Sequence, residues 1–158
     1  MSDKLALVFP SSYLRDFDHP ATMLEMYSLG VDYCADLAGF PRARPRGEMV
    51  MIVRQPIAGW MHAGYPIAAM VQWLPWPLKI DEVKKKGEWG MYHEIGHNHQ
   101  RPCWLLPGTG ESCNNLFSLY VAEKLFKLPS AEAHPAVSKD ERKKRLDTHM
   151  QKGAPFAE

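Results

Sequence analysis

The chain has 158 residues, a length that suits one domain with a sizeable hydrophobic core. Its 19 basic and 18 acidic residues nearly cancel, which excludes the broad positive charge of a nucleic-acid-binding protein. No apolar run is long enough to span a bilayer, and the apolar part of residues 1–10 is too short for a signal peptide. We therefore expect a cytoplasmic location if Met1 is native, and an extracellular one if the chain is a fragment of a secreted enzyme.

The first third of the chain predicts a strand, a helix and a basic loop. Residues 5–9 are apolar and stop at Pro10, which predicts a buried strand. Asp18 can cap a following helix that has Pro20 in its first turn and ends at Gly39. The apolar residues of this helix recur at helical spacing and should face the core: Met23, Met26, Tyr27, Val31, Cys34 and Leu37. Arg42, Arg44 and Arg46 are expected to form an exposed, solvated loop.

The middle of the chain predicts a second strand and a cleft. Residues 48–54 are nearly all apolar, which indicates a strand. Residues 59–67 are dense in glycine and aromatic residues, which is typical of an irregular loop that lines a cleft. Within this loop, His62 and Tyr65 are candidates to contact a substrate or to stabilise an oxyanion. Residues 81–86 predict a short polar turn or helix.

The most informative segment is His93-Glu94-Ile95-Gly96-His97, which carries the pattern H-E-x-x-H. Residues four apart share one face of a helix, so His93 and His97 can direct two imidazoles at one metal ion. Glu94 can then act as the catalytic base towards a water molecule at the same metal. A surface helix that holds two histidines by chance is the alternative.

A hydrolytic zinc ion needs a third protein ligand. One arrangement uses a third histidine six residues after the second, with a glycine midway, but those positions hold Cys103 and Gln100. The other arrangement uses a carboxylate from a following helix. Glu111 opens a predicted helix after a turn-rich stretch and is our candidate, while a first-turn acid stabilised by the helix dipole is the alternative. Glu123 lies deeper in that helix and is the weaker candidate.

Other residues around this segment are candidates for supporting functions. Tyr120 could donate to an oxyanion, and Asn98 or Asn115 could orient a metal ligand. The predicted helix after residue 111 has Leu116, Leu119 and Tyr120 at helical spacing. The following region, 139–150, predicts a charged helix with a solvated surface. We therefore expect a core of residues 5–128 and a charged helical tail of residues 138–158.

Several segments together resemble one family. The stretch Gly87-Glu88-Trp89-Gly90 through Gln100 is similar to the core of the enhancin-like and mucin-degrading zinc metallopeptidases, peptidase family M sixty. The segments at 111–120, 59–67 and 8–15 resemble other parts of the same region. A branch of the family, the animal TRP-channel-associated factors, contains a similar domain. The resemblance therefore covers most of the chain, up to roughly residue 150.

The resemblance implies an α+β fold with a zincin-like (gluzincin) core: a small sheet, an H-E-x-x-H zinc helix and a following helix that bears a glutamate. It implies one Zn²⁺ per chain, held by His93, His97 and Glu111, with Glu94 as catalytic base. It also implies endopeptidase action on a protein or O-glycosylated glycoprotein. The channel-associated branch suggests the alternative, a non-catalytic zinc-binding interaction module. Because family members are usually longer, we expect residues 1–158 to be a partial or reduced catalytic domain, of undetermined oligomeric state.

Overall fold

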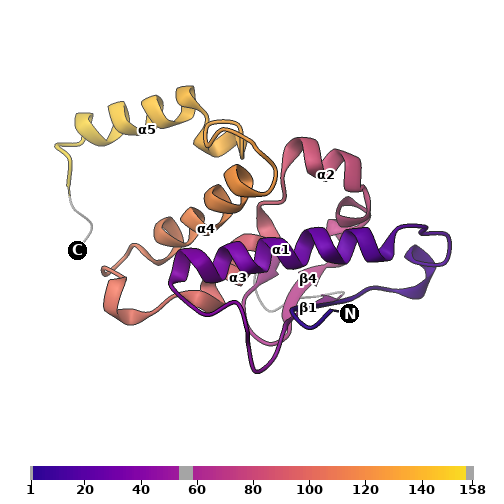
Figure 1. Cartoon of the computed structure of the whole chain (residues 1–158). Helices are drawn as coiled ribbons and strands as arrows, with labels where there is room; N and C mark the ends of the chain where they lie inside the picture. The colour runs from indigo at the N-terminus through magenta and orange to yellow at the C-terminus, as the bar shows by residue number, and fades with distance from the viewer. Residues whose placement is uncertain (1, 54–58, 156–158) are drawn as a thin grey trace.

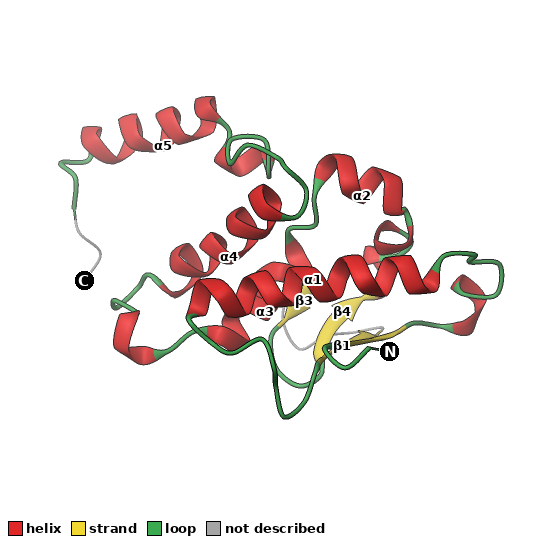
Figure 2. Ribbon diagram, viewed as in Figure 1, coloured by secondary structure: helices red, strands yellow, loops and turns green. Residues whose placement is uncertain are grey.

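The computed structural model describes residues 2–53 and 59–155. Four strands form one sheet in the order β1-β2-β4-β3, visible behind the long first helix in Figure 2. Their bounds are Leu5–Val8 (β1), Glu48–Val53 (β2), Met61–His62 (β3) and Ile67–Met70 (β4). Strands β1, β2 and β4 run parallel, whereas β3 pairs with β4 in the antiparallel direction. Among the described strands, β3 is therefore an edge strand that pairs with β4.

Five α-helices accompany the sheet in the described part of the chain (Figure 1). They are α1 (Pro20–Ala38), α2 (Ile80–Lys86), α3 (Gly90–His99), α4 (Gly110–Lys124) and α5 (Lys139–Gln151). Short 3₁₀ turns connect several of them, including η2 (Val71–Trp73), η3 (Trp76–Leu78), η4 (Pro102–Trp104) and η5 (Pro135–Val137). The predicted α+β class is confirmed.

Helix α3 lies in the centre of the fold, because it packs against both α1 and α4. Its apolar residues Met91, Tyr92 and Ile95 are fully buried. Gly30 of α1 allows the close approach, since a β-carbon there would lie 2.1 Å from the Tyr92 hydroxyl oxygen. That hydroxyl donates a hydrogen bond to the carbonyl of Tyr27. One face of α3 is thereby fixed in the core, and the opposite face is left for polar side chains.

The strand and helix predictions for the first third of the chain are largely confirmed. Strand β1 and helix α1 form where the pattern places them, and α1 ends at Gly39 in the left-handed conformation. The predicted burial of β1 is wrong beyond Leu5, since Val8 is 41% exposed. The predicted cap is wrong: the N-cap residue is His19 rather than Asp18, and no side chain caps the helix. Leu37 is 39% exposed, so this residue of the predicted apolar stripe lies outside the core.

The arginine loop is not simply solvated, which corrects that prediction. Arg42 forms a two-pronged ion pair with Asp36, and Arg46 lies 3.7 Å from the ring centre of Tyr65. Arg44 is half-buried, pairs with Glu48 at 2.9 Å and contacts His99 of α3. Arg42 and Arg44 thus link the loop to α1, β2 and α3, and Arg46 links it to the segment after β3.

Two further predictions need correction. Residues 59–67 are not wholly irregular, because β3 forms within them and Ile67 begins β4. Residues 67–70 were missed as a strand, since two of the four are alanines, which have low strand propensity. Strand β2 is confirmed over residues 48–53, while residue 54 lies outside the described residues.

The last two helices differ in how they join the body. In α4, Phe117 and Val121 are buried, whereas Leu116 of the predicted apolar stripe is 55% exposed. Helix α5 forms as predicted, and none of its residues is buried; in Figure 1 it projects away from the other helices. In the described residues, no helix combines the length and apolarity that a membrane crossing requires.

Candidate metal centre

The H-E-x-x-H segment lies in α3, as its pattern predicts. His93 and His97 are half-buried on the same side of the helix, and their ring centres are 4.9 Å apart. The opposite side of α3 carries the buried Tyr92 and Ile95. The helix is therefore held in the core by its apolar side while both imidazoles remain accessible.

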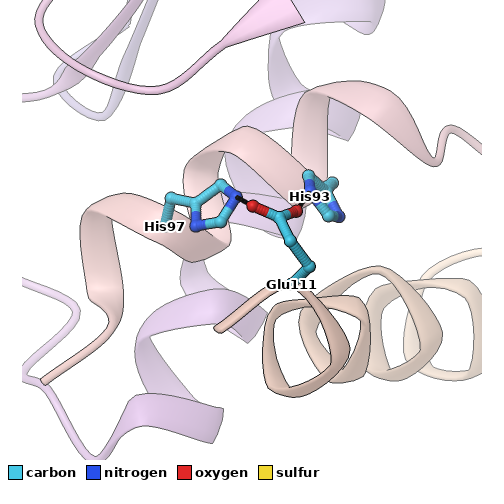
Figure 3. A group of neighbouring side chains, drawn as sticks. All are labelled: His93, His97 and Glu111. Carbon is cyan, nitrogen blue, oxygen red and sulfur yellow. Dashed lines mark hydrogen bonds and ion pairs between the residues drawn. The ribbon is translucent and has the colours of Figure 1, made fainter. Parts of the chain in front are cut away.

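Glu111 reaches both imidazoles from α4. Figure 3 shows its carboxylate between His93 and His97, with one oxygen directed at each ring. Its Oε2 lies 3.0 Å from His93 Nε2, and its Oε1 lies 3.4 Å from His97 Nε2. One ligand atom from each of the three residues lies within 4.8 Å of the others. Residues separated by up to 18 positions thus meet at one point.

Helices α3 and α4 can meet this closely because Gly96 has no side chain. A β-carbon there would lie 2.4 Å from Asn114 Oδ1 and 2.9 Å from two ring carbons of Phe117. Asn114 is fully buried and donates a hydrogen bond from its amide to the carbonyl of His93. Ser118, one turn further along α4, donates to the carbonyl of Trp89 at 2.9 Å. The glycine in the motif therefore sets the distance from Glu111 to the histidines.

Each imidazole is oriented by an amide oxygen on its other nitrogen. Asn115 Oδ1 lies 2.9 Å from His93 Nδ1, and Gln100 Oε1 lies 2.9 Å from His97 Nδ1. An amide oxygen only accepts hydrogen bonds, so each Nδ1 carries the proton and donates it. Each Nε2 then presents its lone pair towards Glu111, which is the form in which histidine binds a metal.

The three donors fit a zinc ion. Ligand atoms about 2.0–2.1 Å from a tetrahedral zinc lie about 3.4 Å from one another, close to the 3.0 and 3.4 Å separations between Glu111 and the rings. Two imidazole nitrogens and one carboxylate also form a known set of catalytic zinc ligands. Chemistry and spacing agree.

Glu94 lies beside this cluster and is only 9% exposed. Burial raises the pKa of its carboxyl group above the usual value, while the nearby imidazoles of His93 and His97 act in the opposite direction. The backbone N–H of Ala63 also favours the carboxylate. Glu94 is thus next to both the candidate ligands and the end of strand β3.

The other three predicted substrate or oxyanion contacts, His62, Tyr65 and Tyr120, make contacts outside the His93–His97–Glu111 cluster. His62 belongs to β3, and its Nδ1 lies 3.0 Å from the carbonyl of Ala63. Tyr65 stacks under Arg46. Tyr120 packs edge-on against Tyr33 of α1, with ring centres 6.3 Å apart. Since Tyr120 and Glu111 are nine residues apart, they lie on opposite sides of α4.

Asn98 contacts the loop that follows β3 rather than a candidate ligand. Its amide oxygen accepts from Gly64 N–H at 3.1 Å, and its amide nitrogen donates to Gly64 O at 3.0 Å. The same nitrogen donates to Glu48 at 2.9 Å. Asn98 thereby ties the end of α3 to β2 and to the segment after β3.

Two residues that sequence reasoning missed support the cluster: Gln100 and Asn114. Gln100 lies three residues after His97, a spacing at which side chains on a helix meet, and that signal could have identified it. Asn114 gave no comparable signal, because its partner is a backbone carbonyl on another helix.

Comparisons with known proteins agree with this geometry. A family profile described as "Peptidase M60, enhancin and enhancin-like" matches residues 1–158. The chain is 37% identical over 158 residues to TRPM8 channel-associated factor 2 of Bos taurus, and it spans 17% of that protein's length.

Solved structures share the fold. A functionally unknown conserved protein from Bacillus anthracis str. Ames superposes with a TM-score of 0.71 at 21% identity, over 94% of this chain and 31% of that one. A metallopeptidase from Bacteroides thetaiotaomicron superposes with a TM-score of 0.65 at 27% identity, over 81% of this chain and 22% of that one. With the profile match along its whole length, the chain belongs to the peptidase M60, enhancin and enhancin-like family.

Proposed function

We propose that the chain is the zinc-binding part of a zincin-like endopeptidase, with residues 5–128 as the core and residues 138–158 as an appended tail, of which residues 156–158 lie outside the described part. The observation that carries the proposal is the convergence of His93 Nε2, His97 Nε2 and the Glu111 carboxylate within 4.8 Å, next to Glu94. These three residues would hold one Zn²⁺. When bound, the ion would polarise a scissile carbonyl and lower the pKa of a coordinated water.

The residues of the chain have distinct tasks in this mechanism. Glu94 accepts a proton from the water that attacks the scissile carbonyl carbon, and then donates it to the leaving amine nitrogen as the C–N bond breaks. Asn115 and Gln100 keep the Nε2 atoms of the two imidazoles available. His62 is the preferred contact to substrate or oxyanion, because it belongs to β3 and precedes Ala63, whose N–H lowers the pKa of Glu94.

The expected substrate is a protein or an O-glycosylated glycoprotein, as in the mucin-degrading members of the family. The support for a peptidase is the family membership and the likeness to a solved metallopeptidase. The chain spans only 17% of the first curated relative, so segments beyond it can also determine substrate choice.

A second candidate function has its own support. Several relatives are named as channel-associated factors, a name that describes interaction rather than hydrolysis. The alternative is therefore a zinc-binding interaction module without activity. An intact Glu94 beside complete ligands favours the enzyme, since a purely structural zinc site has no need of a base.

Metal analysis and product mapping together test the proposal. We expect one zinc per chain in protein purified without chelator, and mass spectrometry of a digested mucin-type glycoprotein should find cleavage products. Glu94→Gln should abolish cleavage and retain zinc, whereas Glu111→Gln should lose zinc. Glu123→Gln is the matched control, because that glutamate is exposed on the same helix.

The outcomes separate the candidates. Absence of zinc from the wild-type protein would overturn the site itself. Zinc without cleavage of the mucin-type glycoprotein would favour the interaction module. Full activity in Glu94→Gln would overturn the mechanism and leave the metal site standing.

A further inference from the structure

A cavity of about 720 Å³ opens beside the candidate metal centre. One wall contains His93 and Glu94, so the cavity is continuous with the site where hydrolysis is proposed. A second wall comes from β3, which contributes Met61 next to the exposed Trp60. The far side is closed by residues 132–135, which precede α5.

Tryptophans dominate this cavity. Four of the five in the chain line it: Trp60, Trp73, Trp76 and Trp89. Three of these rings are held in place by neighbours: Trp73 packs against Phe9, Trp89 against His134, and Trp76 faces the ammonium group of Lys86. Trp60 at the rim is 65% exposed. The fifth, Trp104, packs against Phe117 outside the cavity.

Some polar groups in the wall are paired or buried, whereas Lys85 and Glu132 are exposed. Glu88 is only 4% exposed, and its Oε1 already accepts from Met91 N–H at the start of α3. Lys86 pairs with Glu82 at 3.2 Å at the rim. A sugar would need several accessible hydrogen-bonding partners, and a cation would meet the ammonium groups of Lys85 and Lys86. The accessible surface instead suits an apolar group.

The cavity lies where a substrate side chain would fall. Met61 packs over the start of α3, where a β-carbon on Gly90 would lie 3.1 Å from its sulfur. Glu94 lies in the wall of the same cavity as Met61. A peptide bond placed at Glu94 would therefore have the cavity within reach of an adjacent residue. An apolar pocket next to the reacting groups can determine which substrate side chain is preferred.

We propose that this cavity binds one bulky apolar side chain, aromatic or long aliphatic, of a peptide next to the scissile bond. The inference rests on the proposed function in treating the peptide as a substrate. Binding of the side chain itself needs neither zinc nor hydrolysis. Burying such a side chain should raise affinity by about 10–100-fold over alanine or glycine.

Nuclear magnetic resonance of the five indole N–H groups tests this directly. The whole chain would be titrated with the N-acetyl amides of phenylalanine, leucine, alanine, glycine and arginine, and with N-acetylgalactosamine. We expect phenylalanine and leucine amides to shift the signals of the four cavity tryptophans and to leave Trp104 unchanged. Trp60→Ala should weaken this binding by about fivefold, and Trp104→Ala, the matched control, should leave it unchanged.

Three results would overturn the inference: equal shifts at Trp104, tighter binding of the arginine amide, or tighter binding of the sugar. Repeating the titration in Glu111→Gln, whose altered residue does not line the cavity, and in protein treated with a chelator, separates the two proposals. Unchanged binding in the variant and in the chelator-treated protein, together with no hydrolysis by the wild type, would count against the peptidase. The apolar pocket would still stand.

Discussion

Gln100 joins the two halves of the candidate metal centre. Its side-chain oxygen accepts from His97 Nδ1 at 2.9 Å, while its side-chain nitrogen donates to the carbonyl of Gly110 at 2.7 Å. Gly110 is the first residue of α4 and immediately precedes Glu111. A single amide therefore orients one imidazole and fixes the start of the helix that supplies the carboxylate.

Substitution of Gln100 should weaken zinc binding although Gln100 is not a proposed zinc ligand. Gln100→Ala removes both hydrogen bonds, and loss of such supporting contacts typically lowers metal affinity by about 10–100-fold. Competition with a chromophoric chelator would measure the change. Gln151→Ala, at an exposed position on α5, is the matched control. Unchanged affinity in Gln100→Ala would show that His97 is oriented without it.

Gly96 should tolerate no side chain, because the separation of α3 and α4 depends on it. In Gly96→Ala the new methyl group would collide with Asn114 and Phe117, both of which are buried. We expect a loss of about 1–3 kcal/mol in the free energy of unfolding, together with weaker zinc binding as Glu111 moves outward. Urea denaturation measures the first effect and the chelator assay measures the second.

The matched control for Gly96 lies at the start of α4. A β-carbon on Gly110 would have no atom within 4 Å, so Gly110→Ala should leave stability nearly unchanged or raise it slightly. Equal losses in both variants would mean that glycine at position 96 serves backbone flexibility rather than helix packing.

Much of the candidate site could be predicted from the sequence, because its chemistry is local. The spacing of His93 and His97 places them together on any helix. Asn115 lies one turn beyond Glu111, so these two side chains share a face of α4. The close approach of α4 to α3 is a tertiary contact that local sequence patterns do not predict. It depends on Gly96 and the buried Asn114.

The rest could not be predicted, because it depends on contacts between distant segments. Arg44 meets His99 across 55 positions, so its loop looked solvated in sequence. Helix α4 buries Asn114 and Ser118 against α3, and an apolar-stripe argument therefore chose the wrong face and placed Leu116 inside. Strand β4 contains two alanines, whose burial comes from its position between β2 and β3 rather than from its own pattern.

Stability should respond to pH through Glu88. Burial raises the pKa of this carboxyl group in the folded state above its usual value. A raised folded-state pKa means that its stabilising contribution is complete below the unfolded pKa of about 4.3 and is lost as pH rises towards the folded pKa. Glu88→Gln removes the titration and keeps an oxygen that can accept from Met91 N–H.

We therefore expect the advantage of Glu88→Gln over the wild type to grow as pH increases from about 4 to 8. Guanidinium unfolding at several pH values in that interval measures it, with Glu25→Gln at an exposed position on α1 as control. A constant difference across the interval, or one that shrinks with rising pH, would contradict a raised pKa for buried Glu88.

Helix α5 should be dispensable for the fold. No residue of α5 is buried, and its exposed apolar residues Leu146 and Met150 are not part of the core. Its own start is stabilised locally, since Ser138 accepts a hydrogen bond from the backbone N–H of Glu141. A chain that ends at Ser138 should keep its melting temperature within about 2 °C of the full chain and bind zinc equally well.

A chain shortened further, past the end of the core, provides the contrast for this prediction. A chain that ends at Leu125 also loses Phe126 and Ala133, which are 8% and 6% exposed, together with one wall of the tryptophan-lined cavity. That chain should melt well below the full one, because it exposes core surface. If the chain ending at Ser138 melted equally low, α5 would have to pack against the body in solution, and its separation from the core would be wrong.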